Sequence, residues 1–179
     1  LDQISIRDGL TEGYLGQLDL EKANFHQEAQ IYVQQRKLGR DNPALVGPLT
    51  KLGRWYDRSN QTEAARLVYQ GAARLVEAAD GQNSPGMVEP LLAIAETYRQ
   101  QALLPPDPES NQSPETLLPL SSMMLRKALG IVEQQSPPDP AERARILVKL
   151  GDLYLMWGKQ NTASERYKEA WQILSADPA

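Results

Sequence analysis

The sequence predicts an all-α protein built from four antiparallel helix hairpins that stack on one another. One observation is a pattern of leucine, glycine, tyrosine and alanine that occurs twice with identical internal spacing. A second is that the apolar members of this pattern lie three or four residues apart, as on one face of an α-helix. A third is that a single hairpin is too small to bury its own apolar face, so the copies must stack.

The clearest copy of the pattern has two leucines, a glycine and a tyrosine on a first helix, followed by alanine, tyrosine and alanine on a second: Leu147, Leu150, Gly151, Tyr154, Ala163, Tyr167 and Ala170. The same types lie 98 residues earlier at Leu49, Leu52, Gly53, Tyr56, Ala65, Tyr69 and Ala72. Gly53 and Gly151 are small where two helices must approach closely. We therefore expect the tyrosines to fill the space beside these glycines.

Two further copies fit a frame of 42 residues. One begins with Leu91, Ile94, Ala95 and Tyr98 and resumes, after a proline-rich insertion of about fourteen residues, with Ser121, Leu125 and Ala128. The other is degraded and keeps only Leu10, Tyr14 and Ala23, with Arg7, Gln27 and Gln30 at positions that should be apolar or small. The sequence thus predicts one domain over residues 1–179 with repeats at 4–39, 43–81, 85–135 and 140–175.

These residues resemble the tetratricopeptide repeat (TPR), whose family pattern spaces Trp or Leu, Leu-Gly, Tyr, Ala, Tyr or Phe, and Ala in this way. The family repeat has 34 residues, and the longer period here is similar to that of kinesin light chains and many bacterial TPR proteins. The family proline that ends the second helix is missing, with Glu77 and Ser175 in its place. The resemblance implies a right-handed α-α superhelix that works as a non-enzymatic scaffold for protein–protein interaction.

In the first repeat, glycines weaken the first helix, because each costs roughly 1 kcal/mol relative to alanine: Gly9, Gly13 and Gly16. Asp19 is expected to cap the second helix, which should stop at Gly39. The only histidine, His26, has no candidate metal or catalytic partners, and we interpret it as an ordinary residue of a helix face.

The three later repeats are each expected to begin with a capping residue and a proline at the first helical position: Asn42-Pro43, Ser84-Pro85 and Asp139-Pro140. Pro48 and Pro90 lie five residues further on, where proline removes a helical hydrogen bond and crowds the preceding turn. We expect a loosened first turn or a kink at both places. The second helix of the second repeat should end near Asp80-Gly81, and a turn is expected at Gly158.

The insertion at 104–114 is rich in proline and polar residues and lacks apolar periodicity. It is expected to be an exposed loop, and both a binding element and a tolerated surface insertion fit that description. The helix that follows should begin near Thr116 to Pro119, with Met123 and Met124 as core filler.

Composition excludes several classes of function. The net charge of −4 argues against a nucleic-acid surface, which would be basic. There are no cysteines, so disulfides and thiolate zinc sites are excluded. We find no phosphate-binding loop, metal-ligand spacing or activated nucleophile, so no cofactor or enzymatic activity is expected. No segment is long enough to cross a membrane. The compartment stays undetermined, because the chain begins with Leu1 and a cleaved signal peptide is compatible with it.

In the TPR family, the first helices of successive repeats line a concave groove that holds a peptide or helix. The resemblance places twelve residues there: Asp8, Glu12, Leu15, Thr50, Arg54, Asp57, Leu92, Glu96, Arg99, Val148, Asp152 and Leu155. A carboxylate clamp is not expected, because one equivalent row is mostly acidic and contains no Asn. Two interpretations remain: a groove for a segment with apolar groups and at least one basic group, or pairing of Arg54 with Glu12 or Glu96 and of Asp57 with Arg99 to neutralise the wall.

We therefore predict a protein-binding scaffold, with two alternatives. One is a structural spacer or oligomerisation module, and the other is a regulatory domain of a larger protein. The last helix carries a wide apolar stripe that ends in Trp171 and Leu174, and terminal repeats need a polar outer face. We expect part of this stripe to be uncovered, and the chain to self-associate there or to continue into a helix that docks on it.

Overall fold

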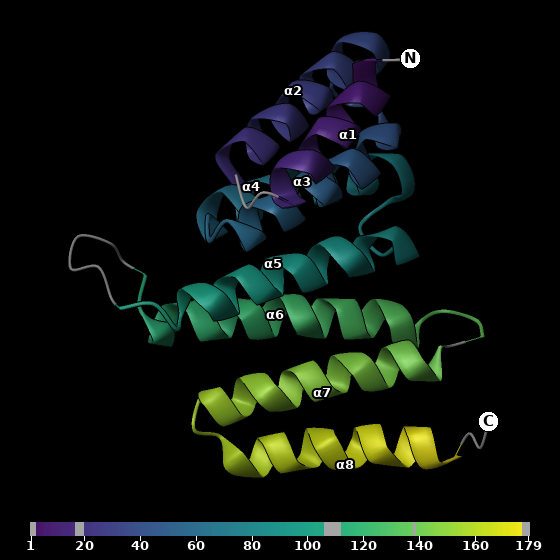
Figure 1. Cartoon of the computed structure of the whole chain (residues 1–179). Helices are drawn as coiled ribbons and strands as arrows, with labels where there is room; N and C mark the ends of the chain where they lie inside the picture. Colours follow the sequence, from purple (N-terminus) through teal and green to yellow (C-terminus); the bar gives the residue numbers. More distant parts are fainter. Residues whose placement is uncertain (1–2, 17–19, 106–111, 138, 177–179) are drawn as a thin grey trace. The chain divides into compact units, whose positions relative to one another are not determined.

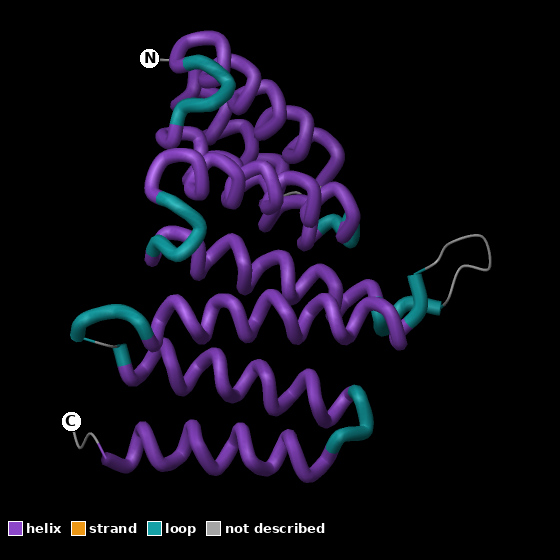
Figure 2. The backbone as a smooth tube through the Cα atoms, turned by 180° about the vertical axis from the view of Figure 1, so that it is seen from behind, coloured by secondary structure: helices purple, strands orange, loops and turns teal. Residues whose placement is uncertain are grey.

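The computed structural model describes residues 3–16, 20–105, 112–137 and 139–176, without the side chains of residues 3–5, 8, 12, 15, 16, 20 and 21. Within these ranges the chain has eight α-helices and no strand (Figures 1 and 2). They are α1 (Gln3–Gly16), α2 (Leu20–Leu38), α3 (Val46–Arg58), α4 (Thr62–Asp80), α5 (Val88–Gln101), α6 (Pro114–Glu133), α7 (Pro140–Met156) and α8 (Gln160–Ala176). Consecutive helices pair as four antiparallel hairpins, which confirms the predicted all-α class.

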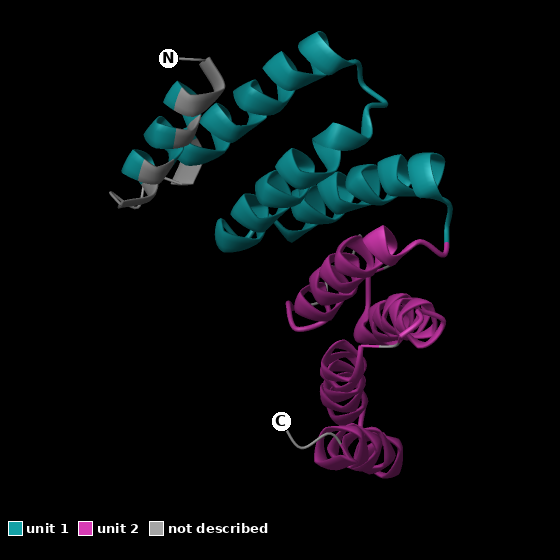
Figure 3. Cartoon of the chain, turned by 90° about the vertical axis from the view of Figure 1, so that its right-hand side faces the viewer, with its two compact units in different colours: residues 1–82 teal, residues 83–179 magenta. Residues whose placement is uncertain are grey.

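The hairpins belong to two compact units, residues 1–82 and 83–179, with two hairpins in each (Figure 3). The prediction of one continuous domain over the whole chain stays a prediction. None of the described helices is long and apolar enough to cross a lipid bilayer.

In the first unit α1 packs on α2, α2 on α3, and α3 on α4. Many of the buried apolar side chains of this unit lie at repeat positions: Ala23, Leu52, Ala65, Tyr69 and Ala72. The degraded first repeat buries polar residues instead. Gln27 donates a hydrogen bond from Nε2 to Oγ1 of Thr11 over 3.0 Å, and Thr11 donates to the carbonyl of Arg7 over 2.8 Å. These bonds satisfy polar groups that would otherwise be costly to bury.

In the second unit α5 packs on α6, α6 on α7, and α7 on α8. Its buried apolar side chains again lie at the repeat positions: Leu91, Ile94, Ala95, Leu125, Ala128, Leu147, Leu150, Ala163 and Ala170. Figure 1 shows these four helices as a row of alternating direction, so that α5 and α7 run the same way.

Short 3₁₀ turns precede α3 and α5, at Pro43–Leu45 and Pro85–Met87. Pro48 and Pro90 therefore each occupy the third residue of the α-helix, where the backbone N–H has no intrahelical partner to lose. The first turn at both places is irregular as predicted, since it is a 3₁₀ turn, but neither proline removes a helical hydrogen bond as was expected.

The predicted caps differ from one another. Asn42 accepts from the backbone N–H of Ala44 over 2.9 Å, and Asp139 accepts from those of Ala141 and Glu142 over 3.0 and 3.1 Å. Ser84 makes no side-chain cap bond. The expected cap at Asp19 lies outside the described residues.

The predicted helix ends and turn are confirmed at glycines with left-handed backbone: Gly39, Gly81 and Gly158, with φ of 91°, 88° and 74°. The start of α6 was predicted too late, since the helix begins at Pro114, with Ser113 and Thr116 forming a capping box. Most of the predicted loop, residues 106–111, lies outside the described residues. The core role expected of Met123 is wrong, because its side chain is 53% exposed.

Candidate functional site

The second and fourth hairpins each place a tyrosine ring directly over a glycine. A Cβ added at Gly53 would lie 2.7 Å from two ring carbons of Tyr69, and one at Gly151 would lie 2.5–2.9 Å from three ring carbons of Tyr167. Real Cβ atoms almost never come this close to another atom, so a larger residue at either position would require the ring to shift. The predicted close contacts at both glycines are confirmed.

The hydroxyl of each ring reaches a carboxylate on the first helix of its own hairpin. Tyr69 donates to Oδ2 of Asp57 and Tyr167 donates to Oδ1 of Asp152, each over 2.7 Å. Burial first, and then the hydrogen bond with the Asp152 carboxylate and its charge, raises the pKa of Tyr167 to about 12. Tyr167 therefore remains a neutral donor at neutral pH.

The third hairpin differs at both of these positions. Ala95 stands where the other two hairpins have glycine, and Leu125 stands where they have tyrosine. Both side chains are buried. Ser121 lies one turn before Leu125 and donates to the carbonyl of Ala95 over 2.8 Å, which joins α6 to α5 at this point.

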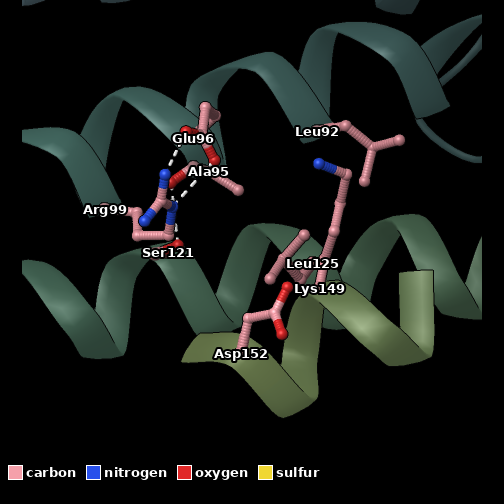
Figure 4. A pocket seen from close by; sticks show the side chains of 8 residues that line it. All are labelled: Leu92, Ala95, Glu96, Arg99, Ser121, Leu125, Lys149 and Asp152. Carbon is pink, nitrogen blue, oxygen red and sulfur yellow. Dashed lines mark hydrogen bonds and ion pairs between the residues drawn. The ribbon is translucent and has the colours of Figure 1, made fainter. Parts of the chain in front are cut away.

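A pocket of about 340 Å³ lies where the third hairpin lacks its tyrosine (Figure 4). Its lining comes from α5, α6 and α7, all in the second unit: Leu92, Ala95, Glu96, Arg99, Ser121, Leu125, Lys149 and Asp152. The apolar members and Ser121 are buried and form its base, whereas the four charged side chains are partly or fully exposed and form its rim.

Two of the four charges neutralise each other. Arg99 donates to both carboxylate oxygens of Glu96, over 2.9 Å from Nε and 2.5 Å from an Nη, and Gln100 adds a bond of 3.3 Å. Burial alone would raise the pKa of Glu96. The bonds and charge of Arg99, with a contribution from Lys149, outweigh burial and hold that pKa below its ordinary value.

The other two charges belong to α7. The Asp152 carboxylate accepts from Tyr167 through one oxygen. The hydrogen bond with Glu96 raises the pKa of Arg99, and the charge of Asp152 adds to this effect. Lys149 makes no hydrogen bond or ion pair with any residue that the structure describes. Figure 4 shows its side chain extending beside Leu125 toward Leu92. The pocket rim thus presents an ammonium group and a carboxylate with one oxygen not used by Tyr167.

The structure brings four of the twelve sequence-predicted groove residues together at this pocket: Leu92, Glu96, Arg99 and Asp152. Val148 is 39% exposed and lines a neighbouring hollow between α7 and Leu174 of α8, which shares Lys149 and Asp152 with this pocket. Leu155 is 50% exposed.

The predicted groove residues of the first unit lie on α3 and α1. Arg54 is exposed, whereas Thr50 is buried and donates to the carbonyl of Val46 over 2.9 Å. Asp57 is the acceptor of Tyr69. The side chains of Asp8, Glu12 and Leu15 lie outside the described residues.

Four pocket residues were not predicted as groove residues: Ala95, Ser121, Leu125 and Lys149. The sequence contained a signal for Ala95, Ser121 and Leu125, because all three are positions of the repeat frame. At Leu125 this frame has leucine in place of tyrosine. Lys149 lies three residues before Asp152 and hence on the same helix face.

Among the described residues no group of three or more histidine, aspartate or glutamate side chains is placed to hold a metal ion. His26 stacks on the ring of Tyr14 at a centroid distance of 5.5 Å.

The fold is that of TPR-like repeat proteins. One similar structure is BtubC (BKLC) from P. vanneervenii, with a TM-score of 0.76, 17% identity, and coverage of 98% of this chain and 66% of that one. Another is a Podosopora anserina putative kinesin light chain with nearly identical TPR-like repeats, with a TM-score of 0.74, 13% identity, and coverage of 98% and 77%. Its Q17M form gives a TM-score of 0.73, 15% identity, and coverage of 97% and 75%. No family model matches the sequence, and no curated protein matches it.

Proposed function

We propose that this chain is a protein-interaction module without enzymatic activity, which holds a peptide or helix of a partner protein on the face formed by its first helices. The observation that carries the proposal is the pocket between α5, α6 and α7. It lies on the face that the TPR resemblance assigns to ligand binding, and it combines a buried apolar base with a polar rim. Ligand sites in proteins commonly have this composition.

The charges of the pocket limit the kind of partner segment that fits it. Because Glu96 and Arg99 neutralise each other, the pocket does not need a strongly charged ligand. It suits a segment that inserts an apolar group and makes hydrogen bonds at the rim. We extend the proposal to the first unit, where Arg54 on α3 occupies the position equivalent to Glu96.

The proposal is tested by selecting peptides from a random display library on the purified chain and measuring their Kd by fluorescence anisotropy. Glu96→Lys should weaken peptides that bind at the pocket at least tenfold, or about 1.4 kcal/mol, and Arg54→Glu should do the same for peptides that bind on α3. Matched reversals on exposed positions of the second helices, Arg74→Glu and Lys168→Glu, should change Kd less than twofold. Equal effects of the two sets would refute binding on the first-helix face.

A second candidate function, self-association, is favoured by one observation. Trp171 is 73% exposed and Leu174 is 53% exposed on α8, the last described helix. The expected uncovered stripe is therefore present. Burying such side chains is worth roughly 1.5–3 kcal/mol each, which favours a contact with a second copy.

A further inference from the structure

Two hairpins of this chain show what normally fills the space beneath the pocket rim. In each, a tyrosine of the second helix lies over a glycine of the first, and its hydroxyl meets an aspartate 2.7 Å away. Tyr69 is 1% exposed, so this position accommodates a whole aromatic ring inside the protein.

The third hairpin retains the position but not the ring. Leu125 is shorter than tyrosine and carries no hydroxyl, and the methyl group of Ala95 occupies only a small part of the space that is left. Both residues are buried at the base of the pocket, with exposed fractions of 4% and 1%. Leu92 on α5 and Lys149 on α7 also line the pocket (Figure 4).

The rim supplies polar partners of the kind that the internal tyrosines use. Asp152 lines the pocket and accepts a tyrosine hydroxyl through one of its two carboxylate oxygens. Lys149 adds an ammonium donor that makes no hydrogen bond or ion pair with the residues that the structure describes. A phenol hydroxyl both donates and accepts, so it can use both groups at once.

We propose that this pocket binds a tyrosine side chain of the partner segment, which takes the place of the tyrosine that the third hairpin lacks. The proposal rests on the proposed function and specifies its ligand. The ring packs on Leu92, Ala95 and Leu125, and the hydroxyl lies between Lys149 and Asp152. Phenylalanine fills the same space but leaves the two polar groups without a partner, so it binds more weakly.

The probe for this proposal is 4-methylphenol, the side chain of tyrosine without its backbone, with toluene as the matched probe for phenylalanine. Binding is followed by NMR shifts of the methyl groups of Leu92, Ala95 and Leu125. A fragment of this size is expected to bind with a Kd of about 1–10 mM. Toluene should bind at least threefold more weakly.

The control variant is Ala95→Gly with Leu125→Tyr, which gives the third hairpin the pair present in the second and fourth. Its own tyrosine should occupy the pocket, so that 4-methylphenol no longer shifts Leu92. Circular dichroism and the melting temperature establish that the variant is folded. Lys149→Met provides an independent test that leaves the core unchanged, and it should remove the preference for 4-methylphenol over toluene.

Shifts confined to the pocket methyls and abolished in the double variant support the proposal. Shifts spread over the surface, binding that persists when the pocket is filled, or a preference unaffected by Lys149→Met would overturn it. The outcome is separable from the proposed function. Display peptides that bind the groove but retain their Kd when their tyrosines become alanine would refute this proposal alone. Failure to select any peptide, with 4-methylphenol still bound, would refute the proposed function instead.

Discussion

The contact between Gly53 and Tyr69 predicts that an otherwise favourable substitution is harmful. Alanine is the better helix former by about 1 kcal/mol, so Gly→Ala inside a helix normally stabilises a protein. At Gly53 the new Cβ would lie 2.7 Å from two carbons of the Tyr69 ring. The ring is 1% exposed and its hydroxyl is held by Asp57, so it cannot move away without breaking other contacts.

Overpacking of this kind costs about 1–3 kcal/mol, which cancels or exceeds the gain in helix propensity. The net expectation for Gly53→Ala is a loss of about 0–2 kcal/mol. The matched control is Gly71→Ala in α4, which lies in the same unit and has no atom within 4 Å of an added Cβ. That variant should gain about 0.5–1 kcal/mol.

The free energy of unfolding is measured for each variant by urea titration with circular dichroism. A double-mutant cycle with Tyr69→Leu sharpens the test, because Ala95 and Leu125 show that alanine and leucine are compatible at this position. We expect a favourable coupling of about 1–2 kcal/mol between Gly53→Ala and Tyr69→Leu. If Gly53→Ala stabilised the protein as much as Gly71→Ala, the close contact, and with it the alignment of the repeats, would be refuted.

Three further predictions concern other parts of the chain. Asp139→Ala should lower the free energy of unfolding in urea by about 1 kcal/mol, because it removes two cap hydrogen bonds. Ser84→Ala changes a cap position without a side-chain hydrogen bond and should be nearly neutral. Equal losses for the two variants would contradict this prediction. The pKa of Glu96 is lower in the folded state, so its pair with Arg99 contributes stability above the unfolded pKa of about 4.5, and this stability is lost as pH falls through the folded pKa. Glu96→Gln should therefore reduce the fall in melting temperature at acidic pH. A fall equal to that of the wild type would count against the pair. Trp171→Lys should leave the melting temperature of dilute protein unchanged, because the side chain is exposed. In light scattering it should abolish any increase of the molecular mass with protein concentration. A wild-type chain that stays monomeric at all concentrations would rule out self-association.

The sequence was sufficient to predict the hairpins because their signals are local. Glycine caps, prolines at helix starts and apolar residues at helical spacing act within a few residues of the chain. The start of α6 was predicted too late because the capping box of Ser113 and Thr116 was not recognised, and Pro119 is accommodated inside the helix.

The candidate site was only partly predictable. The helix face of Glu96, Arg99 and Asp152 follows from the repeat frame, but their pairing does not. The neutralising partner of Arg99 is Glu96, one turn away on the same helix, and Asp57 is held by Tyr69. Choosing among nearby partners requires side-chain distances, which a repeat pattern does not contain. The pocket itself results from a residue that is smaller than expected, and a search for functional groups does not detect this.

The exchange of glycine and tyrosine for alanine and leucine also constrains how the third repeat diverged from the others. Two substitutions separate the pairs, and one of the two possible intermediates combines alanine with tyrosine, which the geometry at Gly53 and Gly151 disfavours. The other combines glycine with leucine, which leaves a larger hollow but forces no atoms together. For a repeat that starts from glycine and tyrosine, the path through glycine and leucine therefore avoids the steric conflict.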